Sequence, residues 1–89
     1  MEYELDERKR LSNIKKHHGV DFAAAKDFDW ETALVAYDGW LDDEDRWIAI
    51  GFIGIVVYLM VYTERGENIR IISLRKATPK EEKYYVKNS

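Results

Sequence analysis

The sequence WIAIGFIGIVVYLMVY, residues 47–62, decides the fold class of this chain. These 16 residues carry no formal charge, so a membrane span has to be considered first. A span needs about 20 apolar residues. This run is shorter, contains Gly51 and Gly54, and is rich in the Ile and Val that favour strands. It therefore predicts two paired β-strands, residues 46–52 and 54–63.

The second of these strands is predicted to lie inside a sheet. Both of its alternating faces are apolar, so both should be covered. Residues 64–67 predict a hairpin turn, and residues 68–75 the next strand. Residues 34–37 suggest another strand, and residues 3–5 a short edge strand.

Three helices are predicted from their caps. Asp6 begins one that runs to about residue 16, and Asp21 begins a short second one over residues 22–28. Thr78, Pro79 and Glu81 predict the start of a C-terminal helix, because they form a capping box with proline at the first helical position. The expected fold is α+β: an antiparallel sheet of about four strands with two N-terminal helices and one C-terminal helix. At 89 residues the chain is one domain, residues 1–89.

Charge is unevenly spread along the chain. Residues 1–18 have a net charge of +1, residues 19–63 of −7 and residues 64–89 of +3. If the two ends meet in the fold, they form a local positive patch suited to a polyanion. The chain has no cysteine, which rules out disulfides and thiol catalysis. The acidic residues 42–45 lack the ligand spacing of a calcium loop and predict a solvated turn.

The strand over residues 68–76 carries the first candidate site. Strict alternation places Arg75 on one face with Ile69, Ile71 and Ser73, and places Arg70, Ile72, Leu74 and Lys76 on the other. Cations on a rigid strand can bind phosphates and stabilise the charge that develops during attack on a phosphodiester. The alternative is a half-buried strand whose arginines pair with Asp or Glu.

His17 and His18 form the second candidate site. They stand in the last turn of the first predicted helix, where the helix dipole favours imidazolium, a possible general acid or phosphate contact. The alternative is a packed or helix-capping histidine. A metal site is not expected, because adjacent histidines point in different directions. Tyr84 and Tyr85 offer a phenol as proton donor or stacking platform, or simply pack in the core.

Four stretches resemble one protein family: YELDERK at residues 3–9, NIKKHHGVDF at 13–22, RWIAIG at 46–51 and VYTERGENIRIISLRKA at 61–77. They are similar to the patterns E-W-D-x-x-K, N-x-x-K-H-G-V-x-F, R-x-x-x-x-G and V-Y-T-x-R…I-R-I-I-S-A-R-x-A of BrnT-type toxins of type II toxin–antitoxin modules. The last stretch is long and specific. Leu5 stands where the family usually has Trp, and an extra residue lies between Asn13 and Gly19.

The resemblance implies a RelE-like ribonuclease fold and a cytoplasmic toxin that cleaves RNA without a metal or other cofactor and so arrests translation. The implied partner is a BrnA-like ribbon-helix-helix antitoxin. DNA would be bound only through the antitoxin complex, and no membrane is involved. The alternative is a toxin-like domain that binds an antitoxin but cleaves nothing.

The residue analysis and the resemblance together predict the site. The expected catalytic residues are His18, Arg70, Arg75, Lys76 and Tyr84, and the expected RNA-binding residues are Lys16, His17 and Arg65. His18 is preferred over His17 because it directly precedes the sequence Gly-Val-Asp-Phe. Alternation argues against all of the strand cations sharing one face. The individual acid and base are not assigned.

Overall fold

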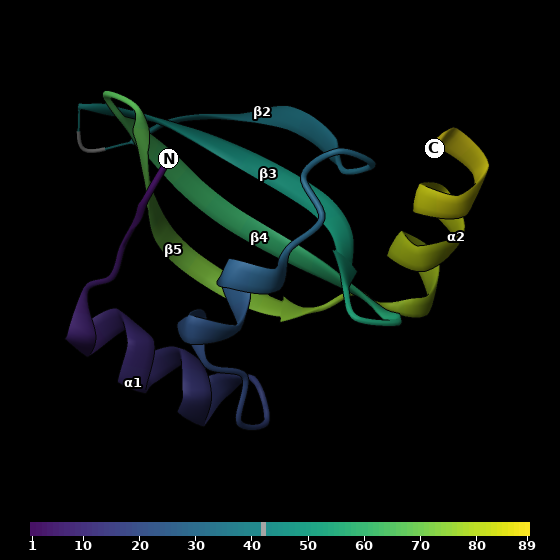
Figure 1. Ribbon diagram of the computed structural model, residues 1–89, viewed down its shortest axis with the longest axis horizontal. Coiled ribbons are helices and arrows are strands. Elements are labelled where there is room, and N and C mark those ends of the chain that lie inside the picture. Colours follow the sequence, from purple (N-terminus) through teal and green to yellow (C-terminus); the bar gives the residue numbers. More distant parts are fainter. Residues whose placement is uncertain (42) are drawn as a thin grey trace.

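The fold is built on a five-stranded sheet. Helices flank this sheet, as Figure 1 shows. The computed structural model describes residues 1–41 and 43–89. Along the chain the elements are β1 (Tyr3–Glu4), α1 (Glu7–Lys16), the 3-10 helix η1 (Phe22–Asp27), β2 (Leu34–Leu41), β3 (Glu44–Ile53), β4 (Val56–Arg65), β5 (Asn68–Lys76) and α2 (Pro79–Asn88). The strand order in the sheet is β1-β5-β4-β3-β2.

The apolar run forms two strands, as predicted. β3 and β4 pair antiparallel from Trp47 opposite Tyr62 to Ile53 opposite Val56. β4 lies inside the sheet, between β3 and β5. In the described residues, no helix is long and apolar enough to cross a membrane.

The expected RelE-like arrangement of about four antiparallel strands with two N-terminal helices is wrong. The sheet is mixed, because β1 adds a fifth strand that runs parallel to β5, with Tyr3 opposite Ile69. Only α1 is an α-helix at the N-terminal end. The second segment is η1, a 3-10 helix of 6 residues capped by Asp21. At its ends the N–H of Ala24 donates to the carbonyl of Asp21 and that of Phe28 to the carbonyl of Ala25, which is the three-residue spacing of a 3-10 helix.

The expected turn at residues 42–45 is wrong in part. Glu44 and Asp45 belong to β3, where they pair with the end of β2. Residue 42 lies outside the described residues. The charges of Glu44 and Asp45 do not prevent a strand here because both side chains lie near the sheet margin, where Asp45 is exposed.

A bulge in β5 overturns the strict alternation expected for that strand. Tyr62 pairs with Ile71, but the next β4 residue, Val61, pairs with Ser73, so Ile72 is an extra residue. An extra residue reverses which face the following side chains occupy. Beyond the bulge, Ser73 and Arg75 therefore lie on the same face as Arg70.

The two faces of the sheet are covered differently. On one face, η1 packs against the main core, which consists of Phe22, Ala25, Phe28, Ala49, Met60, Tyr62, Ile69, Ile71 and Leu74. On the opposite face, which carries Arg70 and Arg75, α2 covers only the end around Val57 and Phe52. Figure 1 shows α1 and α2 well apart. Much of the Arg70 face is thus left uncovered by α2.

α2 begins at the capping box predicted from Thr78 and Glu81, with Pro79 at its start. Its buried Tyr85 packs edge to face on Phe52, with ring centroids 5.5 Å apart. The Tyr85 hydroxyl donates to the backbone carbonyl of Thr32 at 3.1 Å. These contacts fix α2 on the sheet.

Asn13 joins α1 to the edge of β5. Its side-chain amide donates to the carbonyl of Leu74 at 2.6 Å and accepts from the N–H of Leu74 at 3.1 Å. The same amide donates to the carbonyl of Val20 at 3.0 Å. Asn13 is only 4% exposed, so it satisfies buried backbone groups on β5 as a neighbouring strand would.

Candidate functional site

A groove of about 440 Å³ lies between α1 and the sheet face that carries Arg70. α1 forms its wall, β5 contributes to its floor and β3 contributes one arginine. Its lining consists of Arg8, Lys9, Ser12, Asn13, Lys16, His17, Arg46, Ile72 and Ser73. We call this the α1–β5 groove. It brings together four cations and one histidine, and none of its described lining residues is acidic.

Spacing along α1 explains the cationic wall. Arg8, Ser12 and Lys16 are four residues apart, and Lys9 and His17 follow one residue after the first and last of them. Residues three or four apart share one side of a helix. The opposite side carries Arg10, whose guanidinium donates to both carboxylate oxygens of Asp21 at 2.8 Å. That ion pair joins α1 to Asp21, the cap of η1. Because it lies on the side of α1 away from the groove, Asp21 does not neutralise the cations that line the groove.

Arg46 reaches the groove from β3, although β4 separates β3 from β5. Its side chain therefore extends over β4 toward Ser73. The Nε of Arg46 is buried without a hydrogen-bond partner, and so is the hydroxyl oxygen of Thr63 on β4. A buried guanidinium nitrogen without a partner is costly. Such an arginine is suited to receiving an anion.

His17 lies at the C-terminal end of α1, where its backbone N–H donates to the carbonyl of Asn13. Its side chain lines the groove. Partial burial, and then the positive charges of Arg75 and Lys16, hold the pKa of His17 below its ordinary value. A lowered pKa favours the neutral imidazole, which can accept a proton.

His18 occupies a different position from His17. Its φ is +53°, in the left-handed region that ends the helix, and its side chain is exposed. It does not line the α1–β5 groove. The structure thus places His17 in the groove, whereas the sequence favoured His18 as the catalytic histidine.

The two predicted β5 arginines share a face, contrary to the alternation argument, but each has an internal partner. Arg75 donates to both carboxylate oxygens of Glu81 on α2, at 2.7 and 2.9 Å. The Arg75 hydrogen bonds hold the pKa of Glu81 down at about 2. Arg70 donates to Asp6 at 3.2 Å.

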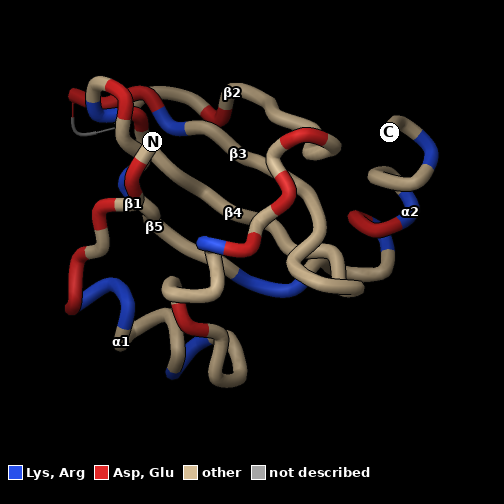
Figure 2. Tube along the Cα trace, in the orientation of Figure 1, with Lys and Arg blue, Asp and Glu red and all other residues tan. Residues whose placement is uncertain are grey.

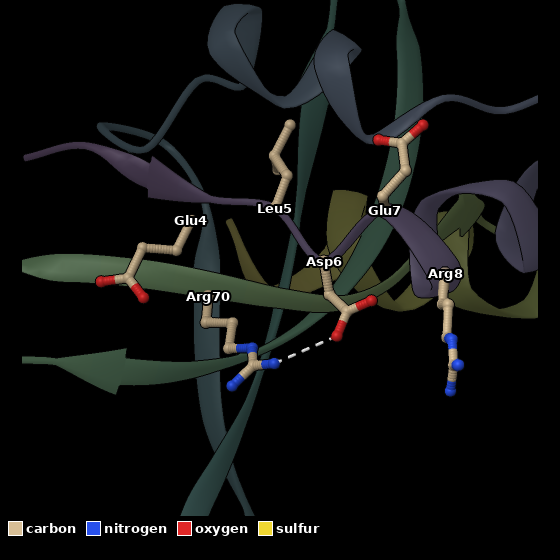
Figure 3. Close-up of a pocket in the computed structure, with 6 residues that line it drawn as sticks. All are labelled: Glu4, Leu5, Asp6, Glu7, Arg8 and Arg70. Atoms are coloured by element: carbon tan, nitrogen blue, oxygen red, sulfur yellow. Dashed lines mark hydrogen bonds and ion pairs between the residues drawn. The ribbon is translucent and has the colours of Figure 1, made fainter.

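A second pocket, of about 690 Å³, surrounds the Arg70–Asp6 pair. Figure 3 shows Asp6 and Arg8 pointing to the same side, and Leu5 and Glu7 to the other. Because Arg8 lines both this pocket and the α1–β5 groove, the two are neighbours. Three carboxylates, those of Glu4, Asp6 and Glu7, line this second pocket, which makes it a poorer anion site than the groove.

The other predicted site residues are dispersed. Lys16 lines the groove. Arg65 stands at the end of β4 and pairs with Glu44. Lys76 is exposed at the end of β5. Tyr84 is 58% exposed on α2 and lines no part of the groove.

The groove also contains residues that were not singled out as site residues: Arg8, Lys9, Ser12, Arg46 and Ser73. The four-residue spacing along α1 is a signal that could have found Arg8 and Ser12. Nothing local in the sequence shows that Arg46 crosses a strand. Among the described residues, no three His, Asp or Glu side chains are grouped to hold a metal ion.

Basic residues are concentrated on α1 and at the end of β5, although the β1 edge also carries acidic residues. Figure 2 shows blue segments on α1 and at the end of β5, whereas β2 carries red and no blue. The two basic ends of the chain therefore do not form one patch: α2, with Lys80, Lys83 and Lys87, lies well away from α1 in Figure 1, and the groove takes its described cations from α1 and β3. Of the acidic residues in the middle of the chain, Asp38, Glu44 and Asp45 lie at the β2 edge, whereas Asp21 pairs with Arg10 of α1.

Comparison with known proteins gives one family. A family model described as "Ribonuclease toxin, BrnT, of type II toxin-antitoxin system" matches residues 5–81. The match spans α1, η1 and the whole of the sheet from β2 to β5, and ends inside α2. A search of curated proteins found no match.

Proposed function

Because the chain belongs to the BrnT family of ribonuclease toxins of type II toxin–antitoxin systems, we propose that the α1–β5 groove binds and cleaves RNA. One observation carries this proposal. Arg8, Lys9, Lys16 and Arg46 converge on a groove whose described lining has no carboxylate. Phosphate contacts supply most of the affinity for nucleic acid. The groove therefore has the charge that an RNA backbone requires.

The proposed reaction needs no metal. Neutral His17 accepts the proton of a ribose 2′-hydroxyl, and the 2′ oxygen attacks the adjacent phosphorus. The bond from phosphorus to the 5′ oxygen breaks, and that oxygen takes a proton from solvent. The products are a 2′,3′-cyclic phosphate and a 5′-hydroxyl end. Arg46 and Lys16 stabilise the charge that grows on the phosphoryl oxygens.

In this proposal the β5 arginines act at the margin of the groove. Arg75 is held by Glu81 and lies near enough to His17 to affect its pKa, so it positions charge beside the base. Arg70 contacts RNA after exchanging Asp6 for a phosphate. His18, Lys76, Tyr84 and Arg65 have no role in proton transfer, because none lines the groove.

The cellular role follows from the family. A ribonuclease toxin of a type II system has RNA as substrate and an antitoxin as partner. We propose that the antitoxin is BrnA-like, with a ribbon-helix-helix part that binds DNA, and that the toxin acts on cytoplasmic RNA and arrests translation. The toxin itself would contact DNA only through the complex.

The test is cleavage of a long single-stranded RNA by the purified chain in excess EDTA, with a parallel reaction in Mg²⁺. Arg46→Ala should slow cleavage by about 100-fold, the usual cost of one stabilising group. Arg65→Ala is the matched control, because it removes an arginine paired with Glu44 outside the groove. Equal rates for Arg46→Ala and the wild type would disprove the proposed site, and cleavage only with Mg²⁺ would disprove the metal-free route.

The alternative function is antitoxin binding without cleavage. The pairing of Arg70 with Asp6 and of Arg75 with Glu81 favours it, since neither arginine is free for a phosphate. Absence of cleavage in both buffers, together with normal growth when the chain is induced without antitoxin, would establish this alternative. Growth arrest without cleavage of free RNA would indicate that the ribosome is required.

A further inference from the structure

β2 is an open edge of the sheet. It is the last strand in the order and pairs on one side only, with β3, within the described residues. An unpaired edge presents backbone N–H and C=O groups that another extended chain can bind. β2 spans 8 residues, long enough for such pairing.

Apolar side chains stand on one face of this edge. Val35, Tyr37 and Trp40 are 50%, 54% and 64% exposed. Their partners on β3 are Ala49, Trp47 and Asp45, alternate residues that share a face. The register shift between Tyr37 and Gly39 keeps Trp40 on the same face as Tyr37. We call Val35, Tyr37, Trp40 and Trp47 the aromatic strip.

The strip is already ordered without a partner. The rings of Tyr37 and Trp47 pack edge to face with centroids 5.2 Å apart. The Tyr37 hydroxyl donates to Asp45 at 2.8 Å, which fixes the ring beside a carboxylate. Exposed Trp and Tyr held in this way are the residues that dominate the energy of protein interfaces.

The surroundings of the strip are acidic. Residues 27–45 contain eight Asp and Glu and no Lys or Arg. Asp38, at the register shift, and Asp45, beside Tyr37, are both exposed. Figure 2 shows this edge carrying red and no blue. The charge is opposite to that of the α1–β5 groove, which lies toward the other edge of the sheet.

The acidic charge around the aromatic strip indicates which kind of partner can bind the β2 edge. RNA would be repelled. A second copy paired edge to edge would bring two acidic stretches together, which is unfavourable. A segment of another protein that is extended, apolar on one face and rich in Lys or Arg matches the strip, the edge and the charge at once.

We propose that the antitoxin adds a basic extended segment to β2. Its backbone pairs with the β2 edge, its apolar side chains cover the aromatic strip and its cations meet Asp38 and Asp45. The inference rests on the proposed function only in taking the antitoxin as the partner. The binding site is separate from the groove, so its test does not depend on cleavage.

The experiment uses the complex of the chain with the protein encoded by the adjoining gene. Affinity is measured by calorimetry for the wild type, Trp40→Ala, and the double variant Asp38→Lys with Asp45→Lys. Trp40→Ala should weaken binding by about 30-fold, the loss expected for a central aromatic contact. The double variant should lower the association rate by about 10-fold at low salt and less at high salt.

Glu82→Lys is the matched control, because Glu82 is exposed on α2 away from the strip. It should leave antitoxin affinity unchanged, and amide spectra of each variant establish that it folds. Unchanged affinity in both β2 variants would overturn the inference. So would a dimer of the chain alone that Trp40→Ala dissociates. Failure of RNA cleavage with β2-dependent antitoxin binding would disprove the proposed function and leave this inference standing.

Discussion

Arg75 on β5 and Glu81 on α2 form a two-pronged ion pair, with nitrogen–oxygen distances of 2.7 and 2.9 Å. The same Glu81 carboxylate accepts the backbone N–H of Thr78 at 2.8 Å and so completes the cap of α2. One carboxylate therefore starts the C-terminal helix, docks it on the sheet and neutralises an arginine beside the groove. Stability and site charge are linked at this residue.

Glu81→Gln should lower the free energy of unfolding at pH 7 by about 1–2 kcal/mol, because charge-assisted hydrogen bonds are replaced by neutral ones. The pKa of Glu81 is about 2 in the folded chain, against an ordinary value of 4.5. A lowered pKa stabilises the fold above the ordinary value and loses that contribution as pH falls toward the folded value. The difference between wild type and variant should therefore shrink from pH 4.5 to pH 2.

Urea unfolding followed by tryptophan fluorescence at pH 7 and pH 3 measures this difference. Glu82→Gln, at the exposed neighbouring position, is the control and should change stability little. A gap between wild type and Glu81→Gln that stays constant with pH would show that the ion pair contributes no net stability.

Asn13→Ala should destabilise the chain by about 2–4 kcal/mol, because it leaves the N–H and C=O of Leu74 and the carbonyl of Val20 without their partner. Ser12→Ala, one residue away and exposed, controls for helix propensity. Urea unfolding gives the loss, and amide exchange at Leu74 reports whether the β5 edge opens. A loss below about 1 kcal/mol would mean that water replaces the amide.

Gly51→Ala should destabilise the fold by steric overlap rather than by backbone strain. An added Cβ would lie 2.9 Å from the Phe28 ring tip and 3.1 Å from the Ala33 Cβ. Overpacking of this kind costs about 1–3 kcal/mol. In a Phe28→Leu background the same substitution should cost less, and the double-mutant cycle measures the difference. Equal costs in both backgrounds would show that Phe28 is not the obstacle.

The local features of the fold were predictable because they depend on neighbouring residues. The caps at Asp6, Asp21 and Thr78 and the β3–β4 hairpin follow from local chemistry and hydrophobic pattern, and all are confirmed. The parallel pairing of Tyr3 with Ile69 was not predictable, since it joins residues far apart in the chain. Two residues of strand give too little pattern to show a partner.

The candidate site was less predictable for two physical reasons. The bulge at Ile72 shows in the sequence only as a change of phase, from Ile69 and Ile71 to Ile72 and Leu74. A strand that is apolar on both faces gives the same pattern, so strict alternation placed Arg75 on the wrong face. The groove also depends on the length of Arg46, whose side chain starts on β3 and lines the same groove as Ser73 on β5, across β4. The residue at which α1 ends determines whether the imidazole of His17 or that of His18 faces the groove. Helix ends are hard to place from sequence to within one residue.

Arg75→Gln should raise the pKa of His17 toward its ordinary value. Burial is the larger cause of the lowered His17 pKa and would remain, but the nearby positive charge of Arg75 would be removed. Without that charge the imidazolium form is less disfavoured, so the change must be upward. The pKa is read from the NMR titration of the His17 ring proton, with His18→Gln used to assign the two imidazole signals.

Arg75→Gln should also change the pH dependence of RNA cleavage. If neutral His17 is the base, cleavage by the wild type should rise with pH through the His17 pKa and then level off. In Arg75→Gln the rising limb should shift to higher pH by the amount that the NMR titration shows, whereas in Arg65→Gln, which removes an arginine outside the groove, it should stay in place. If the pH dependence of the rate did not follow the measured shift in pKa, His17 would not be the group that transfers the proton. Arg46 and the cationic wall of α1 would still stand as the proposed RNA-binding surface.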